Sequence, residues 1–371
     1  MLPRGESAQR AEVGMSRDYR VVQWGTGNVG REPLRGILLH PRLELAGCHV
    51  FSAEKEGIDA GRLCGRAEVG VPATSDLAVI LELEADCVAY MPRLGHLEEV
   101  CALLRSGKNV ICTPFLFHPE AQPEAERNAL RAACEEGGSS VHGTGIHPGF
   151  VGMILPLVLS GMSRSIRHLR ITEKADWTHY GSPRITFDNM RFGHPPEAAS
   201  LDANAFARFN AKLFEDQIHL LAEALGDAPV EVSVEQDLVV ASTGYEVRAG
   251  RVEAGTVNGQ RYRWRGRSGD RVVIEIDALW TLGGPHPESW PKPREGWTVT
   301  LEGDPSFQTH FVSLASFERR DATIEDHVHA ADIATAMQAI NAIPALCEAP
   351  TGLRAAHELG LVHAGIGLRA D

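Results

Sequence analysis

The sequence has 371 residues, of which 43% are hydrophobic and 23% are charged, and its net charge is −13. At roughly 150 residues per domain, this length predicts about two or three globular domains with cores of their own. The negative charge repels phosphate backbones and acidic membrane surfaces, which argues against a nucleic-acid or membrane partner.

Neither a disulfide framework nor a structural zinc cluster is expected from the seven cysteines, because their number is odd and none form a CxxC pair. A reducing cytoplasm suits this pattern. Residues 1–18 contain no apolar stretch typical of a secretory signal and are expected to form a mobile tail, with Met15 as an alternative start. The longest apolar run, residues 150–162, is shorter than the roughly 20 residues that span a bilayer and predicts a buried helix.

The first half of the chain alternates strands with helices. An apolar strand at residues 19–24 leads into a glycine-rich turn and a helix that ends near Leu39. Further strands are predicted at residues 44–51, 69–73, 86–91, 109–113 and 140–142, and helices between them include residues 97–105 and 123–136. This alternation predicts an α/β fold with a Rossmann-type parallel sheet over residues 19–150.

The second half has a different pattern, because its strands follow one another directly. They are expected at residues 166–172, 230–240, 251–256, 261–265, 272–282, 297–302 and 307–314, with one long helix at about residues 203–225. Asn258-Gly259 is typical of a tight hairpin turn. We expect a second, mostly antiparallel α+β domain over residues 151–323 that binds substrate, and C-terminal helices over residues 324–371 that return to the first domain.

The turn Gly25-Thr26-Gly27-Asn28-Val29-Gly30 has the GxGxxG spacing and lies between a strand and a helix, where this motif binds dinucleotides. Gly25 permits the tight turn, Gly27 the approach of a pyrophosphate, and Gly30 close packing of helix on strand. The amides of this turn, including those of Thr26, Asn28 and Val29, would face the phosphates.

The residues after the second strand favour NADP(H). Ser52 stands where an NAD-specific site usually has an acid, and Lys55, with Arg62 nearby, suits a 2′-phosphate. Glu54 could still bind a ribose, so NAD(H) remains an alternative. Ligands of a parallel sheet bind at the carboxyl ends of its strands, where Met91, Pro92 and Thr113 are the further expected cofactor contacts.

Three motifs resemble the dehydrogenases with a dihydrodipicolinate-reductase-like cofactor domain, especially 2,4-diaminopentanoate dehydrogenase and the native amine dehydrogenases. They are Val21-Val-Gln-Trp-Gly-Thr-Gly-Asn-Val-Gly30, Gly143-Thr-Gly-Ile-His-Pro-Gly-Phe150 and Ile340-Asn-Ala-Ile-Pro-Ala-Leu346. The resemblance implies that the middle region binds substrate and forms a dimer. It also implies that Asn341 lies at the cofactor domain, and that His147 lies beside the nicotinamide where many relatives have asparagine.

One segment departs from this family. The amine dehydrogenases have two acids after the fifth strand, whereas this chain has Pro114-Phe115-Leu116-Phe117. Proline and phenylalanine neither accept a proton nor stabilise an iminium, so the resemblance carries over the fold and the cofactor but not the substrate. The apolar replacements favour a small, fairly apolar substrate.

The proton donor must then come from another segment. Glu173 and Tyr180 follow the first strand of the second domain, and His147 follows the last strand of the first, so these three are the candidate catalytic residues. His329 and Asp332 share a helix face without a third ligand, so no metal is expected.

These patterns predict a homodimeric oxidoreductase that transfers hydride to or from a carbonyl or imine carbon. The alternative is a catalytically silent relative that only binds NADP(H).

Overall fold

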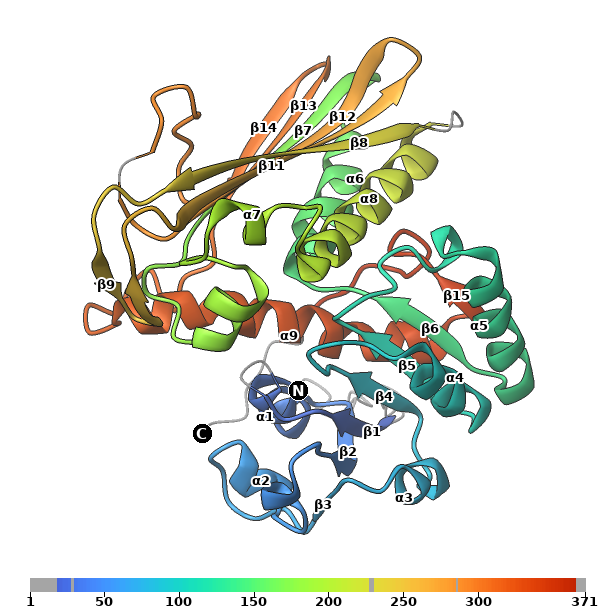
Figure 1. The fold of residues 1–371 in the computed structure, drawn as a ribbon. Coiled ribbons are helices and arrows are strands. Elements are labelled where there is room, and N and C mark those ends of the chain that lie inside the picture. Colours follow the sequence, from blue (N-terminus) through green and yellow to red (C-terminus); the bar gives the residue numbers. More distant parts are fainter. Residues whose placement is uncertain (1–18, 28–29, 227–229, 285, 365–371) are drawn as a thin grey trace, which may run out of the picture.

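The first domain is built on a parallel sheet. The computed structural model describes residues 19–27, 30–226, 230–284 and 286–364 (Figure 1). Seven strands pair in the order β15-β6-β5-β4-β1-β2-β3. Their bounds are β1 Tyr19–Trp24, β2 Leu43–His49, β3 Ala73–Thr74, β4 Cys87–Tyr90, β5 Asn109–Cys112, β6 Ser140–Gly143 and β15 Gly352–Arg354. All neighbours are parallel, which confirms the predicted Rossmann-type sheet.

Helices cover both faces of this sheet, because its strands are apolar on both sides. One face packs against α1 (Arg31–Leu39), the short α2 (Ala60–Leu63) and the C-terminal helix α9 (Ile324–Glu348). The other face packs against α3 (Leu77–Glu82), α4 (Leu97–Arg105) and α5 (Glu124–Gly137). Only β15 was not expected from the sequence.

The second domain is a six-stranded sheet in the order β14-β13-β7-β12-β11-β8. The strands are β7 Ser165–Asp176, β8 Glu231–Val240, β11 Val257–Ser268, β12 Arg271–Thr281, β13 Gly296–Asp304 and β14 Phe307–Phe311. All pairs are antiparallel except β7 with β12, so the predicted mostly antiparallel sheet is confirmed. A separate hairpin joins β9 (Tyr245–Val247) to β10 (Gly250–Val252).

The long helix α8 (Ala205–Leu225) and the short helices α6 (Leu155–Ser160) and α7 (Pro196–Ala199) complete this domain. Phe214 of α8 stacks on Trp264 of β11, with ring centroids 4.4 Å apart. The sheet thus has an apolar inner face. Figure 1 shows α6 and α8 beneath this sheet, and α9 running between the two sheets.

One expected strand and one expected hairpin turn are wrong, because tertiary hydrogen bonds give these residues a different conformation. The strand predicted at residues 69–73 is reduced to β3, since the Asp59 carboxylate accepts the backbone N–H groups of Val69, Gly70 and Val71. The hairpin predicted at Asn258-Gly259 is instead part of the continuous strand β11. Asn258 is fully buried and donates to the Gly283 carbonyl, and the real turn lies at residues 269–270.

The apolar run at residues 150–162 does not form one buried helix. Only α6 is a regular α-helix, and Val158 and Met162 are 58% and 55% exposed. The preceding turn at His147–Gly149 is non-helical, which directs His147 toward the second domain.

Candidate active site

The glycine turn has the geometry that the motif predicts. Gly25 has φ +91°, and a Cβ there would lie 3.0 Å from the Met91 carbonyl oxygen. A Cβ on Gly30 would lie 2.5 Å from the Gly25 carbonyl oxygen, whereas one on Gly27 would meet nothing within 4 Å. Gly27 therefore faces open space, as a pyrophosphate site requires. Asn28 and Val29 lie outside the described residues.

The first turn of α1 is also suited to a phosphate. Gly30 is its N-cap and has no side chain to accept the first N–H groups, so these donors remain for an anionic ligand. The residues present fit a dinucleotide at this end of the sheet.

Three other expected cofactor contacts lie at the carboxyl edge of the same sheet. The Met91 amide donates to the Trp24 carbonyl at 3.0 Å, and the Thr113 amide to that of Tyr90 at 3.4 Å. Met91 and Pro92 are buried, and Thr113 is half-buried. These residues follow β4 and β5 directly, beside the glycine turn.

Lys55 reaches the glycine turn from the loop after β2. Its Nζ donates to the Thr26 carbonyl oxygen at 2.8 Å and to Thr26 Oγ1 at 3.1 Å. Ser52 is half-buried at the start of this loop, and Glu54 is exposed. The loop therefore brings an ammonium group, and no buried acid, to the expected position of the adenosine ribose.

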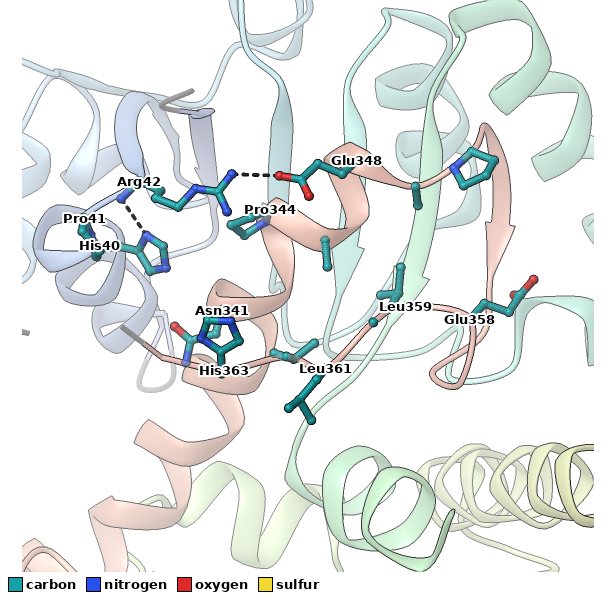
Figure 2. Close-up of a pocket in the computed structure, with 15 residues that line it drawn as sticks. His40, Pro41, Arg42, Asn341, Pro344, Glu348, Glu358, Leu359, Leu361 and His363 are labelled. Carbon is teal, nitrogen blue, oxygen red and sulfur yellow. Dashed lines mark hydrogen bonds and ion pairs between the residues drawn. The ribbon is translucent and has the colours of Figure 1, made fainter. Parts of the chain in front are cut away.

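Asn341 is separated from the other expected cofactor contacts. It lines a cavity of about 490 Å³ together with His40 and Arg42, whose loop leads into the start of β2 (Figure 2). Arg42 Nη2 forms an ion pair with Glu348 of α9 at 2.8 Å. This is the amino edge of the sheet, opposite the glycine turn, although α9 itself packs on the cofactor domain as the resemblance implies.

His147 and Glu173 meet where the two domains join. His147 Nδ1 lies 2.6 Å from Glu173 Oε2. Trp280 Nε1 donates to Glu173 Oε1 at 3.0 Å, so both carboxylate oxygens have a partner. The inner face of β7 is otherwise apolar around this carboxylate, as Leu169 and Ile171 are buried.

Two further residues that sequence reasoning missed bind His147. Gln217 Nε2 lies 3.2 Å from His147 Nε2, and Trp297 Nε1 lies 3.1 Å from His147 Nδ1. Gln217 is fully buried on α8, three positions after Phe214. A polar residue at a core position of an amphipathic helix was the available signal.

Exposure distinguishes the roles of this pair. The His147 side chain is 0% exposed, whereas that of Glu173 is 11% exposed. Of the two side chains, only Glu173 therefore keeps solvent-accessible surface, and the imidazole contacts it from the protein interior.

Tyr180 lies in a different cavity, of about 400 Å³, with Arg31 and Asp332 among its lining residues. Its ring packs on that of Trp177, with centroids 5.0 Å apart. Burial and the charge of Asp332 raise the pKa of Tyr180 to about 12, so the phenol keeps its proton at neutral pH. The structure does not bring Tyr180 to the His147–Glu173 pair.

The segment that replaces the family's acids packs Leu116 into the first domain and Phe117 against Met153 and Leu213 of the second domain. Leu116 and Phe117 are buried, and Leu116 has φ +63°. A Cβ on Gly143 would lie 2.2 Å from the Leu116 carbonyl oxygen, so the chain passes closely over the end of β6.

Among the described residues, no group of three or more histidine, cysteine or acidic side chains is arranged to hold a metal ion. His329 lies 3.1 Å from Glu32 and 3.5 Å from Asp332, as an ion-pair network. No helix within the described ranges is long and apolar enough to cross a membrane.

Comparison with known proteins places this geometry in a family. Residues 150–371 match the family model of the 2,4-diaminopentanoate dehydrogenase C-terminal domain. An amine dehydrogenase of Streptomyces virginiae is 30% identical over 317 residues, which cover 81% of this chain and 87% of the relative. The chain belongs to this family. It is an NAD(P)-dependent oxidoreductase.

Solved structures share the fold. The amine dehydrogenase from Mycobacterium smegmatis superposes with a TM-score of 0.73 at 19% identity, covering 94% of this chain and 98% of that chain. The scyllo-inositol dehydrogenase from Lactobacillus casei, solved with NAD(H) and scyllo-inositol, has a TM-score of 0.53 at 12% identity and covers 88% and 89%. Both share the two-domain fold of this chain, with its Rossmann-type parallel sheet.

Proposed function

We propose that this protein interconverts a small, fairly apolar amine and its carbonyl compound with NADP(H), and that Glu173 is the acid and base of the reaction. The observation that carries this proposal is the carboxylate of Glu173. His147 and Trp280 each contact one of its oxygens, and the side chain still keeps 11% of its surface exposed. Membership of the family favours an amine over an alcohol as the reduced substrate.

Aromatic side chains near the pair suit an apolar substrate. Trp297 packs edge-on against His147, and Phe311 lies 5.8 Å from both Trp297 and Phe150 between ring centroids. An ammonium-rich substrate would need more carboxylates than this neighbourhood offers.

The bound nicotinamide would accept or supply the hydride. In amine oxidation, Glu173 would take one proton from the ammonium form of the substrate, and the carbon of the amine so formed would lose hydride to give an iminium. The iminium adds water and releases the carbonyl compound and ammonium. In the reductive direction, the protonated carboxyl returns the proton. Around it, buried indoles exclude water and keep the carboxylate in place.

The test is a panel of matched primary amines and alcohols with the same carbon skeletons. We expect the amines to reduce NADP⁺ at least tenfold faster than the alcohols, and ketone reduction to require ammonia. Faster reduction of NADP⁺ by the alcohols would show that the enzyme oxidises a CH–OH group and not an amine. The absence of any turnover above background in the whole panel would contradict the proposal.

Cofactor preference is expected to depend on Lys55. Lys55→Ala removes one charge-assisted contact to the 2′-phosphate, which costs about 1.5–3 kcal/mol, so NADPH should bind roughly ten- to hundredfold more weakly while NADH changes little. Titration of both cofactors by calorimetry measures the two effects.

The matched comparison is Arg62→Ala, because Arg62, the other basic residue expected near the 2′-phosphate, is exposed and pairs with Glu68 at 3.4 Å in the structure. Its effect should be small for both cofactors. Equal losses of NADPH and NADH in Lys55→Ala would instead assign Lys55 to the Thr26 turn alone.

We further propose a homodimer through the outer face of the six-stranded sheet. This face carries ion pairs between neighbouring strands and not apolar side chains. Arg261 pairs with Asp277 at 2.7 Å, and Arg263 pairs with Asp237 at 3.1 Å. An antiparallel sheet commonly packs one face on the core and leaves the other face solvated, and the solvated face here is the surface that a second copy could cover. Light scattering at micromolar concentration should give twice the chain mass, and a monomer mass would contradict the assignment.

We propose that the protein is cytoplasmic. All seven cysteines are free of disulfides, which suits a reducing compartment. Fractionation of cells that produce the protein tests this placement.

A further inference from the structure

The side chain of Gln217 is buried in a space that fits its amide group closely. It is 0% exposed on the inner side of α8. A Cβ on Gly152 would lie 1.8 Å from Gln217 Oε1, so only glycine at that position leaves room for the amide. The amide group is therefore held between the turn after β6 and the helix.

The backbone fixes the orientation of this amide. Gln217 Oε1 accepts the N–H of Gly149 at 3.4 Å, which turns Nε2 toward His147 Nε2 at 3.2 Å. An amide nitrogen donates and does not accept, so His147 Nε2 must present its lone pair. The imidazole proton is consequently on Nδ1.

That proton points at Glu173. His147 Nδ1 lies 2.6 Å from Glu173 Oε2, while Trp297 Nε1 approaches the same nitrogen at 3.1 Å. One ring nitrogen does not donate and accept at once, and the shorter, charge-assisted bond to the carboxylate is the stronger. Glu173 thus receives two N–H donors, from His147 and Trp280, as the ionised carboxylate does.

We infer that Gln217 is a positioning residue that selects the Nδ1–H tautomer of His147 and thereby keeps Glu173 ready to accept a proton. This inference rests on the proposed role of Glu173. Gly149 orients the amide of Gln217, Gln217 orients the imidazole of His147, and His147 donates to Glu173. These residues come from both domains.

Few other charged groups face the pair among the residues described here. Glu295 bonds the backbone N–H of Asp176 rather than the pair, and burial with the charges of Asp176 and Glu173 raises its pKa. Lys174 points to the other face of β7, where it bonds Thr281 and lies 4.0 Å from Glu295. The imidazole is therefore the only one of these groups in hydrogen-bond contact with the Glu173 carboxylate.

The direct test is the tautomer of His147 in the full-length protein, read from ¹⁵N and ¹³C histidine spectra with the His147 signals assigned by their loss in His147→Asn. We expect the proton on Nδ1. In Gln217→Glu, which keeps the shape and the Gly149 bond, the carboxylate only accepts, so Nε2 should become protonated. A wild-type proton on Nε2, or an unchanged spectrum in Gln217→Glu, would overturn the inference.

A double-mutant cycle tests the consequence for turnover. Gln217→Met removes the donor at similar volume and should lower kcat about tenfold in the native background, but less than twofold in the His147→Asn background. Gln260→Met is the control, because Gln260 is also buried and bonds only Met190 and Tyr262. It should lower stability without lowering kcat.

Equal losses of kcat in both backgrounds would show a merely structural Gln217, and no loss at all would also overturn the inference. Full activity of Glu173→Gln would contradict the proposed function instead, while the tautomer spectrum would still test Gln217 independently. If Gln217→Met does not fold, Gln217→Glu provides the same cycle.

Discussion

Glu173→Gln is expected to lower kcat by about 10²–10⁴, because a positioned acid or base contributes a factor of this size. The amide keeps the shape of the side chain and its bond from Trp280, but it takes up no proton from the substrate. Steady-state turnover with the best amine of the panel measures the effect, and calorimetry should show an almost unchanged Kd for the cofactor.

Two further variants serve as comparisons for Glu173→Gln. His147→Asn should be milder than Glu173→Gln, since a buried ring acts only through the carboxylate. Tyr180→Phe tests the second candidate from the sequence. A loss as large as that of Glu173→Gln would bring Tyr180 into the reaction, and a fully active Glu173→Gln would remove Glu173 from it.

Phe214→Ala is expected to reduce the free energy of unfolding by about 3–5 kcal/mol, the usual cost of emptying an aromatic core site. Phe214 stacks on Trp264 and contacts the His147 ring edge-on, with centroids 4.9 Å apart. The variant should therefore also lower kcat, because His147 loses one of its supports. Urea unfolding and turnover measure the two effects.

Phe317→Ala is the matched control. Phe317 is 82% exposed, so its removal should change stability by no more than about 0.5 kcal/mol. A similar loss in both variants, or a stable Phe214→Ala with unaltered turnover, would contradict the packing argument.

The catalytic candidates illustrate how far sequence reasoning reached. Glu173 and His147 were predicted separately, from their places after strands, and the structure brings them within 2.6 Å. Tyr180 was predicted on the same grounds as Glu173 but turns away with Trp177. Glu173 lies inside β7 and Tyr180 in the loop after it, and nothing in a linear pattern decides which of the two points toward His147.

The sequence by itself determined the features that depend on near neighbours in the chain. The glycine turn, the helix at Leu97–Arg105 and the strand β12 follow from spacing over a few residues, which sets local backbone conformation. Composition predicts an acidic globular protein, and the glycine motif with its flanking strand and helix predicts the dinucleotide-binding domain.

Only the tertiary structure decided features that join distant segments. Asp59 captures amides that would otherwise extend a strand, Asn258 enters β11 because its side chain binds Gly283, and Asn341 faces the amino edge of the sheet. Gln217 meets His147 across 70 positions of chain. For Asn258 and Gln217, a buried polar group must find its hydrogen-bond partner, and the tertiary packing, not the local sequence, supplies that partner.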